Sequence, residues 1–336
     1  MNSSNEDKFK VASNLFNSNK LEQAENILND ILEDNPKHIN AINLLAVINV
    51  NLKRYDKGIH YFKQGLEIDK NNIALMKNFI TTLNRLKKYD EANKYLNILY
   101  NLTNKSHLIA SELTNNLIML EKKEEAYKFI DNALKTDPES ELLILTKANC
   151  LFELNNFEEA KKLYEKVYNK NNNNFHALFR LGFLNQKDMK FQDAIHCYNK
   201  IIERKERFKN MNKEIALTLY NLGLCYGKME EFALSEKNYI ESISYNNKSV
   251  DTYTNLSNLY LSQNKLEESL DQMNEAIKLN PKKRILYMNL SNIYEKLGKH
   301  KESVFYKRIS AGTIVFKSQE EYGLYEISKV QLNEKI

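Results

Sequence analysis

The sequence predicts an all-α solenoid built from antiparallel helix pairs. Three observations predict this class: a 34-residue period, a small residue at one phase of every period, and prolines confined to another phase. Self-similarity of this kind is the signature of a repeat array, in which each helix pair buries its apolar face by stacking on its neighbours. The length of 336 residues alone would suggest about two globular domains, and the period overrides that expectation.

The small residues mark the point where the second helix of each pair crosses the first. They are Ala24, Gly58, Ala92, Ala126, Ala160, Ala194, Ser235, Ser269 and Ser303, spaced by 34 residues except for 41 between Ala194 and Ser235. A larger side chain there would push the paired helices apart. The facing position of the first helix is small in most repeats (Ala12, Ala46, Ala148, Gly182, Gly223, Ser257, Ser291), with Ile80 and Thr114 as departures.

This frame predicts nine repeats over residues 5–311, each with a first helix (helix A) and a second helix (helix B). They begin at Asn5, Ile39, Ile73, His107, Glu141, Phe175, Ala216, Val250 and Arg284. Apolar residues recur at helical spacing within each, as in Leu178, Leu181 and Leu184 of a helix A. Pro36, Pro138 and Pro281 lie just past helix B, where a residue that cannot continue a helix ends it.

Two irregularities interrupt the frame. Seven extra residues within Arg204–Lys213 predict a longer loop or an extra turn on helix B, with a basic docking loop for an acidic partner as the alternative. Residues 312–336 follow the last repeat and are expected to be a capping segment or a tail. An amphipathic capping helix over Glu320–Leu332 is favoured, and a docked strand or a loose tail remains open.

Composition and charge favour a folded protein outside the membrane. The content of 42% hydrophobic and 28% charged residues suits a folded chain, and the net charge of +5 is spread along it. Nucleic-acid binders concentrate Lys and Arg on one face, so this class is disfavoured. The beginning, MNSSNEDKFKV, lacks the charged and apolar regions of a secretory signal, and no stretch approaches the roughly 20 apolar residues of a membrane span. We therefore expect a cytoplasmic protein.

No pattern of residues indicates catalysis, a cofactor or a metal. Phosphate-binding, dinucleotide-binding, zinc-protease and serine-hydrolase motifs are absent from the sequence. The six histidines never pair at i, i+3 or i, i+4. Cys150, Cys197 and Cys225 form no C-x-x-C pair and are expected to be buried free thiols. The expected protein is not an enzyme, has no cofactor and has no small-molecule substrate.

The stretch from Val250 to Pro281 carries a family resemblance. It reads VDTYTNLSNLYLSQNKLEESLDQMNEAIKLNP, with Tyr253, Leu256, Ser257 and Tyr260 at the positions of W-x2-L-G-x2-Y. The small, aromatic and proline positions that follow hold Ser269, Met273, Ala276 and Pro281. This unit resembles the tetratricopeptide repeat. The resemblance covers residues 5–311 and implies a right-handed superhelix whose helices A line a concave face that binds other proteins.

On that face the family frame places apolar side chains outside the internal stripe. They are Leu142, Leu145, Phe152, Phe179, Phe183, Tyr220 and Leu224. An exposed apolar surface of this extent usually means a binding site. The alternative is that several of these side chains pack between neighbouring helices A.

Asparagines recur at two groove phases. Asn221, Asn255 and Asn289 share one phase with Asn78, and Asn115, Asn149, Asn258 and Asn292 share a neighbouring one. This ladder resembles the repeat array of O-GlcNAc transferases, whose catalytic domain is absent. A side-chain amide offers a donor and an acceptor, so it can bind the backbone of an extended peptide whatever its sequence. The alternative is a high Asn content that reflects codon bias.

The sequence therefore predicts a non-catalytic interaction scaffold that binds an extended peptide or a partner helix in this groove. The alternative is the recognition subunit of a separately encoded glycosyl- or sulfo-transferase, and a nucleic-acid-binding solenoid is less favoured. Two related classes fit poorly. The carboxylate clamp of chaperone-binding repeats would need a partner for Arg180 where His176 and Thr146 stand, and pentatricopeptide RNA readers have a longer repeat.

Overall fold

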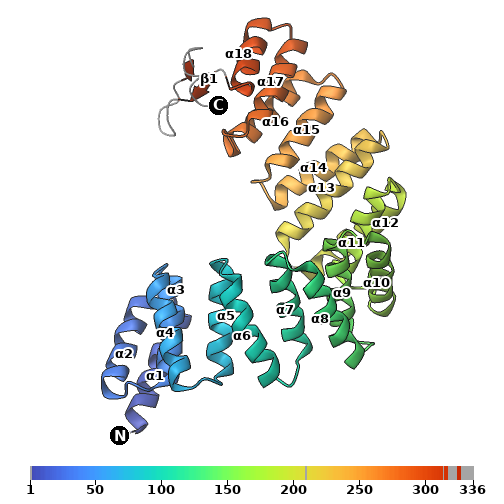
Figure 1. Cartoon of the computed structure of the whole chain (residues 1–336). Coiled ribbons are helices and arrows are strands. Elements are labelled where there is room, and N and C mark those ends of the chain that lie inside the picture. The colour runs from blue at the N-terminus through green and yellow to red at the C-terminus, as the bar shows by residue number, and fades with distance from the viewer. Residues whose placement is uncertain (1, 209, 313, 317–323, 327–336) are drawn as a thin grey trace, which may run out of the picture. The chain divides into compact units, whose positions relative to one another are not determined.

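The computed structural model describes residues 2–208, 210–312, 314–316 and 324–326 (Figure 1). The chain divides into two units, Met1–Lys170 and Asn171–Ile336, which we call the N-terminal and C-terminal units. Odd-numbered α-helices are the helices A and even-numbered ones the helices B. Each helix A packs against the helix B that follows it (Figure 1). The predicted all-α class of paired helices is confirmed, with one short hairpin at the end of the described residues.

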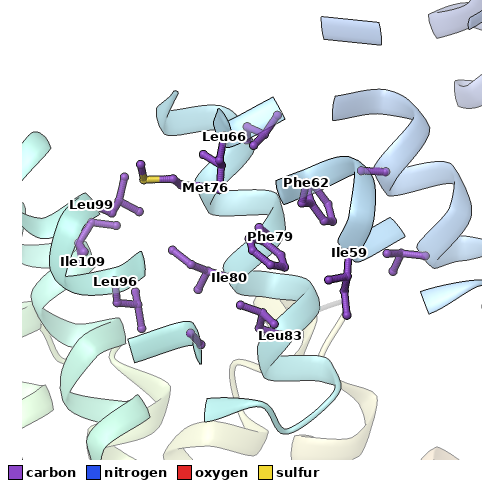
Figure 2. Close-up of a cluster of buried hydrophobic side chains, with 14 of the residues drawn as sticks. Ile59, Phe62, Leu66, Met76, Phe79, Ile80, Leu83, Leu96, Leu99 and Ile109 are labelled. Carbon is purple, nitrogen blue, oxygen red and sulfur yellow. The ribbon is translucent and has the colours of Figure 1, made fainter. Parts of the chain in front are cut away.

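Five helix pairs form the N-terminal unit. Their bounds are α1 Asn2–Asn17, α2 Leu21–Asp34, α3 Ile39–Asn51, α4 Tyr55–Ile68, α5 Ile73–Arg85, α6 Tyr89–Leu102, α7 His107–Met119, α8 Lys123–Thr136, α9 Glu141–Glu153 and α10 Phe157–Lys170. Consecutive pairs share apolar side chains, as in the cluster of Figure 2, where Phe62, Phe79, Leu96 and Ile109 come from α4, α5, α6 and α7. The core is therefore continuous along the unit and has no single centre.

Four helix pairs, a 3-10 turn and a hairpin form the C-terminal unit. The bounds are α11 Phe175–Lys187, α12 Phe191–Ile202, η1 Lys205–Phe208, α13 Asn212–Lys228, α14 Phe232–Tyr245, α15 Val250–Ser262, α16 Leu266–Leu279, α17 Arg284–Lys296, α18 His300–Ser310, β1 Ile314–Phe316 and β2 Leu324–Glu326. Side chains cap several helices A at their first turn, as Asn174 does by accepting from the backbone N–H of Ala177 at 3.0 Å.

The crossing point of each pair is as tight as the small residues require. Gly58 of α4 has no room for a side chain, because an added Cβ would lie 2.8 Å from Cγ2 of Val50 and 3.0 Å from the carbonyl oxygen of Ala46. In α11, a Cβ on Gly182 would lie 2.6 Å from the ring of Tyr198, which stands 16 residues later on α12. Steric contact with helix B therefore selects the small residues of helix A.

The departures at Ile80 and Thr114 have the same explanation. Sixteen residues after Gly182, Gly223 and Ala148 stand the buried tyrosines Tyr198, Tyr239 and Tyr164. Sixteen residues after Ile80 and Thr114 stand the smaller side chains Leu96 and Ile130, also buried. Volume lost on helix B is thus replaced on helix A, which keeps the packing density of the pair constant.

Hydrogen bonds close the crossing in the last three repeats. The Ser257 hydroxyl donates to the backbone carbonyl of Ser269 at 2.7 Å, and the Ser269 hydroxyl donates to the carbonyl of Ser257 at 2.8 Å. Ser291 likewise donates to the carbonyl of Ser303 at 2.8 Å. All four side chains are buried, so each hydroxyl needs such a partner. Serine here supplies small size and satisfies its own polarity.

Each turn from helix A to helix B places one residue in the left-handed region of the backbone. These residues are Asn19, Lys53, Lys87, Glu121, Asn155, Met189, Glu230, Asn264 and Gly298, with φ between 58° and 71°. This conformation costs an ordinary L-residue roughly 1–2 kcal/mol, which glycine avoids. Gly298, with no heavy atom within 4 Å of an added Cβ, is the residue best suited to the position.

We expect Met189→Gly to stabilise the C-terminal unit. Met189 has a φ of 59° and is 77% exposed, so its replacement removes backbone strain without removing buried contacts. The gain should be about 0.5–1 kcal/mol, since the greater unfolded-state freedom of glycine offsets part of the strain. Urea unfolding followed by circular dichroism measures it. Asn155→Gly, at the same turn position, should gain less because Asn tolerates this conformation; a destabilised Met189→Gly variant would contradict the account.

A buried carboxylate joins the first two repeats. Glu25 of α2 is 7% exposed, and it accepts from Nη1 of Arg54 at 2.9 Å and from Nζ of Lys57 at 2.9 Å. Burial raises the pKa of Glu25, but the hydrogen bonds from Lys57 and Arg54 outweigh burial and hold that pKa below its ordinary value. The ionised carboxylate is therefore favoured in the folded state.

This lowered pKa predicts an acid-sensitive contact. The stabilisation is fully present above the unfolded-state pKa of about 4.3 and is lost as the pH falls through the lower folded-state pKa. Glu25→Gln should lower the free energy of unfolding by about 1–2 kcal/mol at pH 7 and by less as the pH falls. Urea unfolding at neutral and acidic pH measures both effects. Glu22→Gln, on an exposed position of α2, is the control, and an equal loss by Glu25→Gln at every pH would contradict the expectation.

The seven extra residues do not extend helix B as expected. They form η1 and the first turn of α13, which begins at Asn212 instead of Ala216. Their cations bind within the C-terminal unit: Lys205 Nζ donates to Oε1 of Glu241 at 2.7 Å, and Arg207 Nη1 donates to Oδ1 of Asn173 at 3.3 Å. Arg204 donates to the backbone carbonyl of Asn172. The basic side chains of this segment thus tie it to neighbouring elements.

The expected capping helix over Glu320–Leu332 is wrong where the structure describes those residues. Residues 324–326 form β2, which pairs antiparallel with β1 in the register Ile314 to Glu326, Val315 to Tyr325 and Phe316 to Leu324. An extended partner at β1 satisfies backbone groups that a helix would satisfy internally. The rest of the expected helix lies outside the described residues.

Candidate peptide-binding face

Four helices A of the C-terminal unit present one row of side chains. The helices α11, α13, α15 and α17 contact each other in that order, and the same repeat phase on them holds Phe183, Leu224, Asn258 and Asn292. Phe183 is 37% exposed, Leu224 is half-buried, and both asparagines are exposed. The row therefore offers apolar contact at its first half and free-standing amides at its second.

The aromatic residues beside this row have a structural role as well. Phe179 is half-buried, and its ring lies 6.0 Å from the ring of Phe175 and 5.8 Å from that of Tyr198. Tyr220 lies 6.1 Å from the ring of Tyr239 and packs, with Leu224, against the core cluster of α14 and α15. Packing between neighbouring helices, the alternative raised from the sequence, thus accounts for part of the apolar pattern.

The first asparagine phase links neighbouring helices A. Asn255 Nδ2 donates to the hydroxyl of Tyr220 at 2.8 Å, from α15 to α13. In the N-terminal unit, Asn78 Nδ2 donates to Oδ1 of Asn43 at 3.0 Å in the same register. Asn221 is only 6% exposed, and Asn289 is half-buried. This phase therefore lies deeper than a groove surface, and it supports the stacking of repeats before it serves any ligand.

Tyr220 keeps a donor for a ligand. Burial and the neighbouring Asp251 raise the pKa of Tyr220, and the hydrogen bond from Asn255 lowers it by less, so the phenol stays protonated. Its oxygen accepts from Asn255, which leaves the hydroxyl hydrogen to reach another acceptor. Tyr220 is half-buried beside Leu224, so this donor lies next to the row.

The second asparagine phase divides between the two units. In the C-terminal unit Asn258 and Asn292 are exposed. In the N-terminal unit Asn149 is half-buried and its Oδ1 accepts from the hydroxyl of Tyr164 at 2.7 Å. Leu142, Leu145 and Phe152 are half-buried on α9 of the same unit. The exposed amides that sequence reasoning sought thus lie on α15 and α17.

The thiols are poor candidates for chemistry. Burial, with smaller effects of Glu124 and Glu153, raises the pKa of the Cys150 thiol to about 11, and burial raises that of Cys225 to about 12. Both are free and buried as predicted, while Cys197 is free and half-buried. A thiol that stays protonated at neutral pH is a weak nucleophile and a weak metal ligand.

Two searches of the described part of the chain gave negative findings. Among the described residues, no group of three or more His, Cys, Asp and Glu side chains is arranged to hold a metal ion. In the same residues, every helix is too short or too polar to cross a bilayer.

Comparison with protein families decides the class. One profile described as tetratricopeptide repeat matches residues 117–181, and a second with the same description matches residues 39–72, 216–249, 250–283 and 286–306. The chain belongs to the tetratricopeptide repeat family. These matches cover repeats in both units and include the stretch from Val250 onward that carried the resemblance in the sequence. A comparison with curated proteins gives no match.

Solved structures share the tetratricopeptide repeat fold. A chain in the crystal structure of the APC/C hetero-tetramer Cut9–Hcn1 is 15% identical with a TM-score of 0.60, over 84% of this chain and 54% of that one. The type IV pilus biogenesis factor PilW gives 16% identity and a TM-score of 0.54, over 60% of this chain and 90% of its own. PilF of Pseudomonas aeruginosa gives 14% identity and a TM-score of 0.52, over 60% and 88%. This chain thus spans about half the length of the first of these.

Sequence reasoning missed one set of exposed residues in this tetratricopeptide array. Ala233, Leu234 and Ile240 lie on the outer side of α14 and are exposed. Their signal was available, since comparing all repeats at the same phase shows that these three positions are apolar in the seventh repeat alone. The earlier comparison followed only the helices A, where the family binds its partners.

Proposed function

We propose that this protein is a non-catalytic interaction scaffold that binds an extended peptide or a partner helix along the helices A of its C-terminal unit. The row Phe183, Leu224, Asn258 and Asn292 carries this proposal. Membership of the tetratricopeptide repeat family supports it, because stacked repeats present extended surfaces used for protein binding.

The row fits an extended peptide for a physical reason. Amide side chains can donate to a peptide carbonyl and accept from a peptide N–H, so Asn258 and Asn292 would hold a backbone without reading its sequence. Phe183 and Leu224 would then select for apolar side chains at one end of the ligand. The Tyr220 hydroxyl hydrogen adds one donor between these halves.

A triple variant tests the proposal. Phe183→Ser, Asn258→Ala and Asn292→Ala together change exposed side chains and leave the buried Asn221 and the Asn255–Tyr220 hydrogen bond in place. In an affinity pull-down from cells that express the protein, read by mass spectrometry, we expect a partner held by the wild type to be lost by at least about tenfold from the triple variant.

A matched control separates binding from folding. Gln192→Ala with Asp271→Ala changes exposed residues of helices B in the same unit and should retain the partner. Circular dichroism and melting should be alike for all three proteins. Equal recovery of every partner by the triple variant and the wild type would contradict the proposed function.

A further inference from the structure

The outer side of α14 is apolar where every other repeat is polar. At the phase of Leu234 the other repeats carry Gln23, Lys57, Glu91, Glu125, Glu159, Asp193, Glu268 and Glu302. At the phase of Ile240 they carry Asn29, Lys63, Asn97, Asp131, Glu165, Asn199, Asn274 and Arg308. At the phase of Ala233 they carry Glu22, Asp56, Asp90, Glu124, Glu158, Gln192, Glu267 and Lys301. Eight repeats of the same chain thus show that the fold does not need apolar residues there.

These residues form one exposed stripe. Ala233, Lys237, Ile240 and Ser244 follow each other at spacings of four, three and four residues, which places them on one face of the helix. Ile240 is 51% exposed and Leu234, beside the stripe, is 40% exposed. The face borders a hollow of about 620 Å³ lined by Ala233, Glu236, Lys237, Ile240, Glu241 and Ser244. Exposed apolar residues gathered in this way mark an interaction site.

The charges around the stripe leave one cation unpaired. Glu236, on one side, accepts from Nζ of Lys265 at 3.2 Å and from the hydroxyl of Tyr260 at 3.0 Å. Glu241, on the other side, accepts from Nζ of Lys205 at 2.7 Å. Lys237 is exposed and has no ion-pair partner among the described residues. A ligand on the stripe therefore meets apolar surface with a single uncompensated positive charge near its middle.

We propose that the outer side of α14 binds an amphipathic helix of a partner protein, through an apolar stripe that carries a carboxylate opposite Lys237. A helix matches the target because α14, with 14 residues, is about 21 Å long and presents its stripe at helical spacing. A second copy of this chain fits less well, since a two-fold axis near the centre of the stripe would set Lys237 against its own symmetry mate. This surface is separate from the row on the helices A.

The test uses a library of helical peptides displayed on phage. Clones are selected on the wild type after depletion on the double variant Leu234→Glu and Ile240→Asn, whose new residues stand at the same phases in other repeats. The variant should fold normally for that reason, and circular dichroism checks it. We expect enriched clones to share an apolar stripe at i, i+4 and i+7 with Asp or Glu beside it. Failure to enrich any clone over the double variant would overturn the proposal.

Charge reversal gives the sharper result. Synthetic peptides from the enriched clones, measured by fluorescence anisotropy, should bind Lys237→Glu at least about tenfold more weakly, and changing their acid to Lys should restore binding. Clones without an acid, or binding unaffected by Lys237→Glu, would overturn the assignment. A wild type that is dimeric by light scattering and monomeric as the double variant would replace it with self-association. The triple variant on the helices A should bind these peptides normally, so this proposal and the proposed function fail independently.

Discussion

Gly182→Ile should destabilise the C-terminal unit by about 3 kcal/mol. An added Cβ at Gly182 would lie 2.6 Å from Cε1 of the Tyr198 ring, and Tyr198 is fully buried, so neither group can move into solvent. The helices α11 and α12 must then separate, and the other contacts between them weaken. Urea unfolding followed by circular dichroism measures the loss. Lys187→Ile, at an exposed position of α11, should change stability by much less.

A second substitution should reverse this effect. Gly182→Ile with Tyr198→Leu recreates the pair Ile80 and Leu96 of the third repeat, which stands at the same two phases. We expect the double variant to recover most of the stability that Gly182→Ile loses, even though Tyr198→Leu alone should be destabilising through a cavity. Additive losses in the double variant would contradict the claim that the two positions exchange volume.

Phe79→Ala should cost the N-terminal unit about 3–5 kcal/mol. Phe79 is fully buried on α5, with its ring 5.2 Å from that of Phe62 on α4 and 4.9 Å from that of Tyr95 on α6 (Figure 2). It therefore joins the second repeat to the third as well as filling its own helix pair. Because a repeat array is held by such neighbour contacts, the variant should also unfold less cooperatively.

Calorimetry and urea unfolding of Phe79→Ala measure both effects. Ile98→Ala is the matched control, since Ile98 of α6 is 43% exposed and its truncation should cost well under the Phe79 value. A loss for Phe79→Ala no larger than that of the control would contradict the assignment of Phe79 to the shared core.

The fold could be predicted from the sequence because each repeat states the same steric requirement again. Ala160 and Ala194, 34 residues apart, are both fully buried at a crossing point. The reciprocal bonds of Ser257 and Ser269 were not predicted, since small size alone explained serine there. The strand over residues 324–326 was also missed, because a strand depends on a partner at a distance while helical periodicity is local.

The binding face could be predicted only in part. Repeat phase tells which side of a helix a residue occupies, but the depth of that side chain depends on how closely the next helix approaches. Asn221, Asn255 and Asn289 share a phase, yet the first is buried, the second bonds to Tyr220 and the third is half-buried. Asn258 and Asn292, one helical turn further on, reach the surface.

Hydrogen–deuterium exchange of the full chain, with and without a captured partner, tests the central claim most directly. Binding along the row Phe183, Leu224, Asn258 and Asn292 predicts slower exchange in α11, α13, α15 and α17, and the triple variant should lose that protection. Protection confined to the helices B of the C-terminal unit, or found only in the N-terminal unit, would contradict the account.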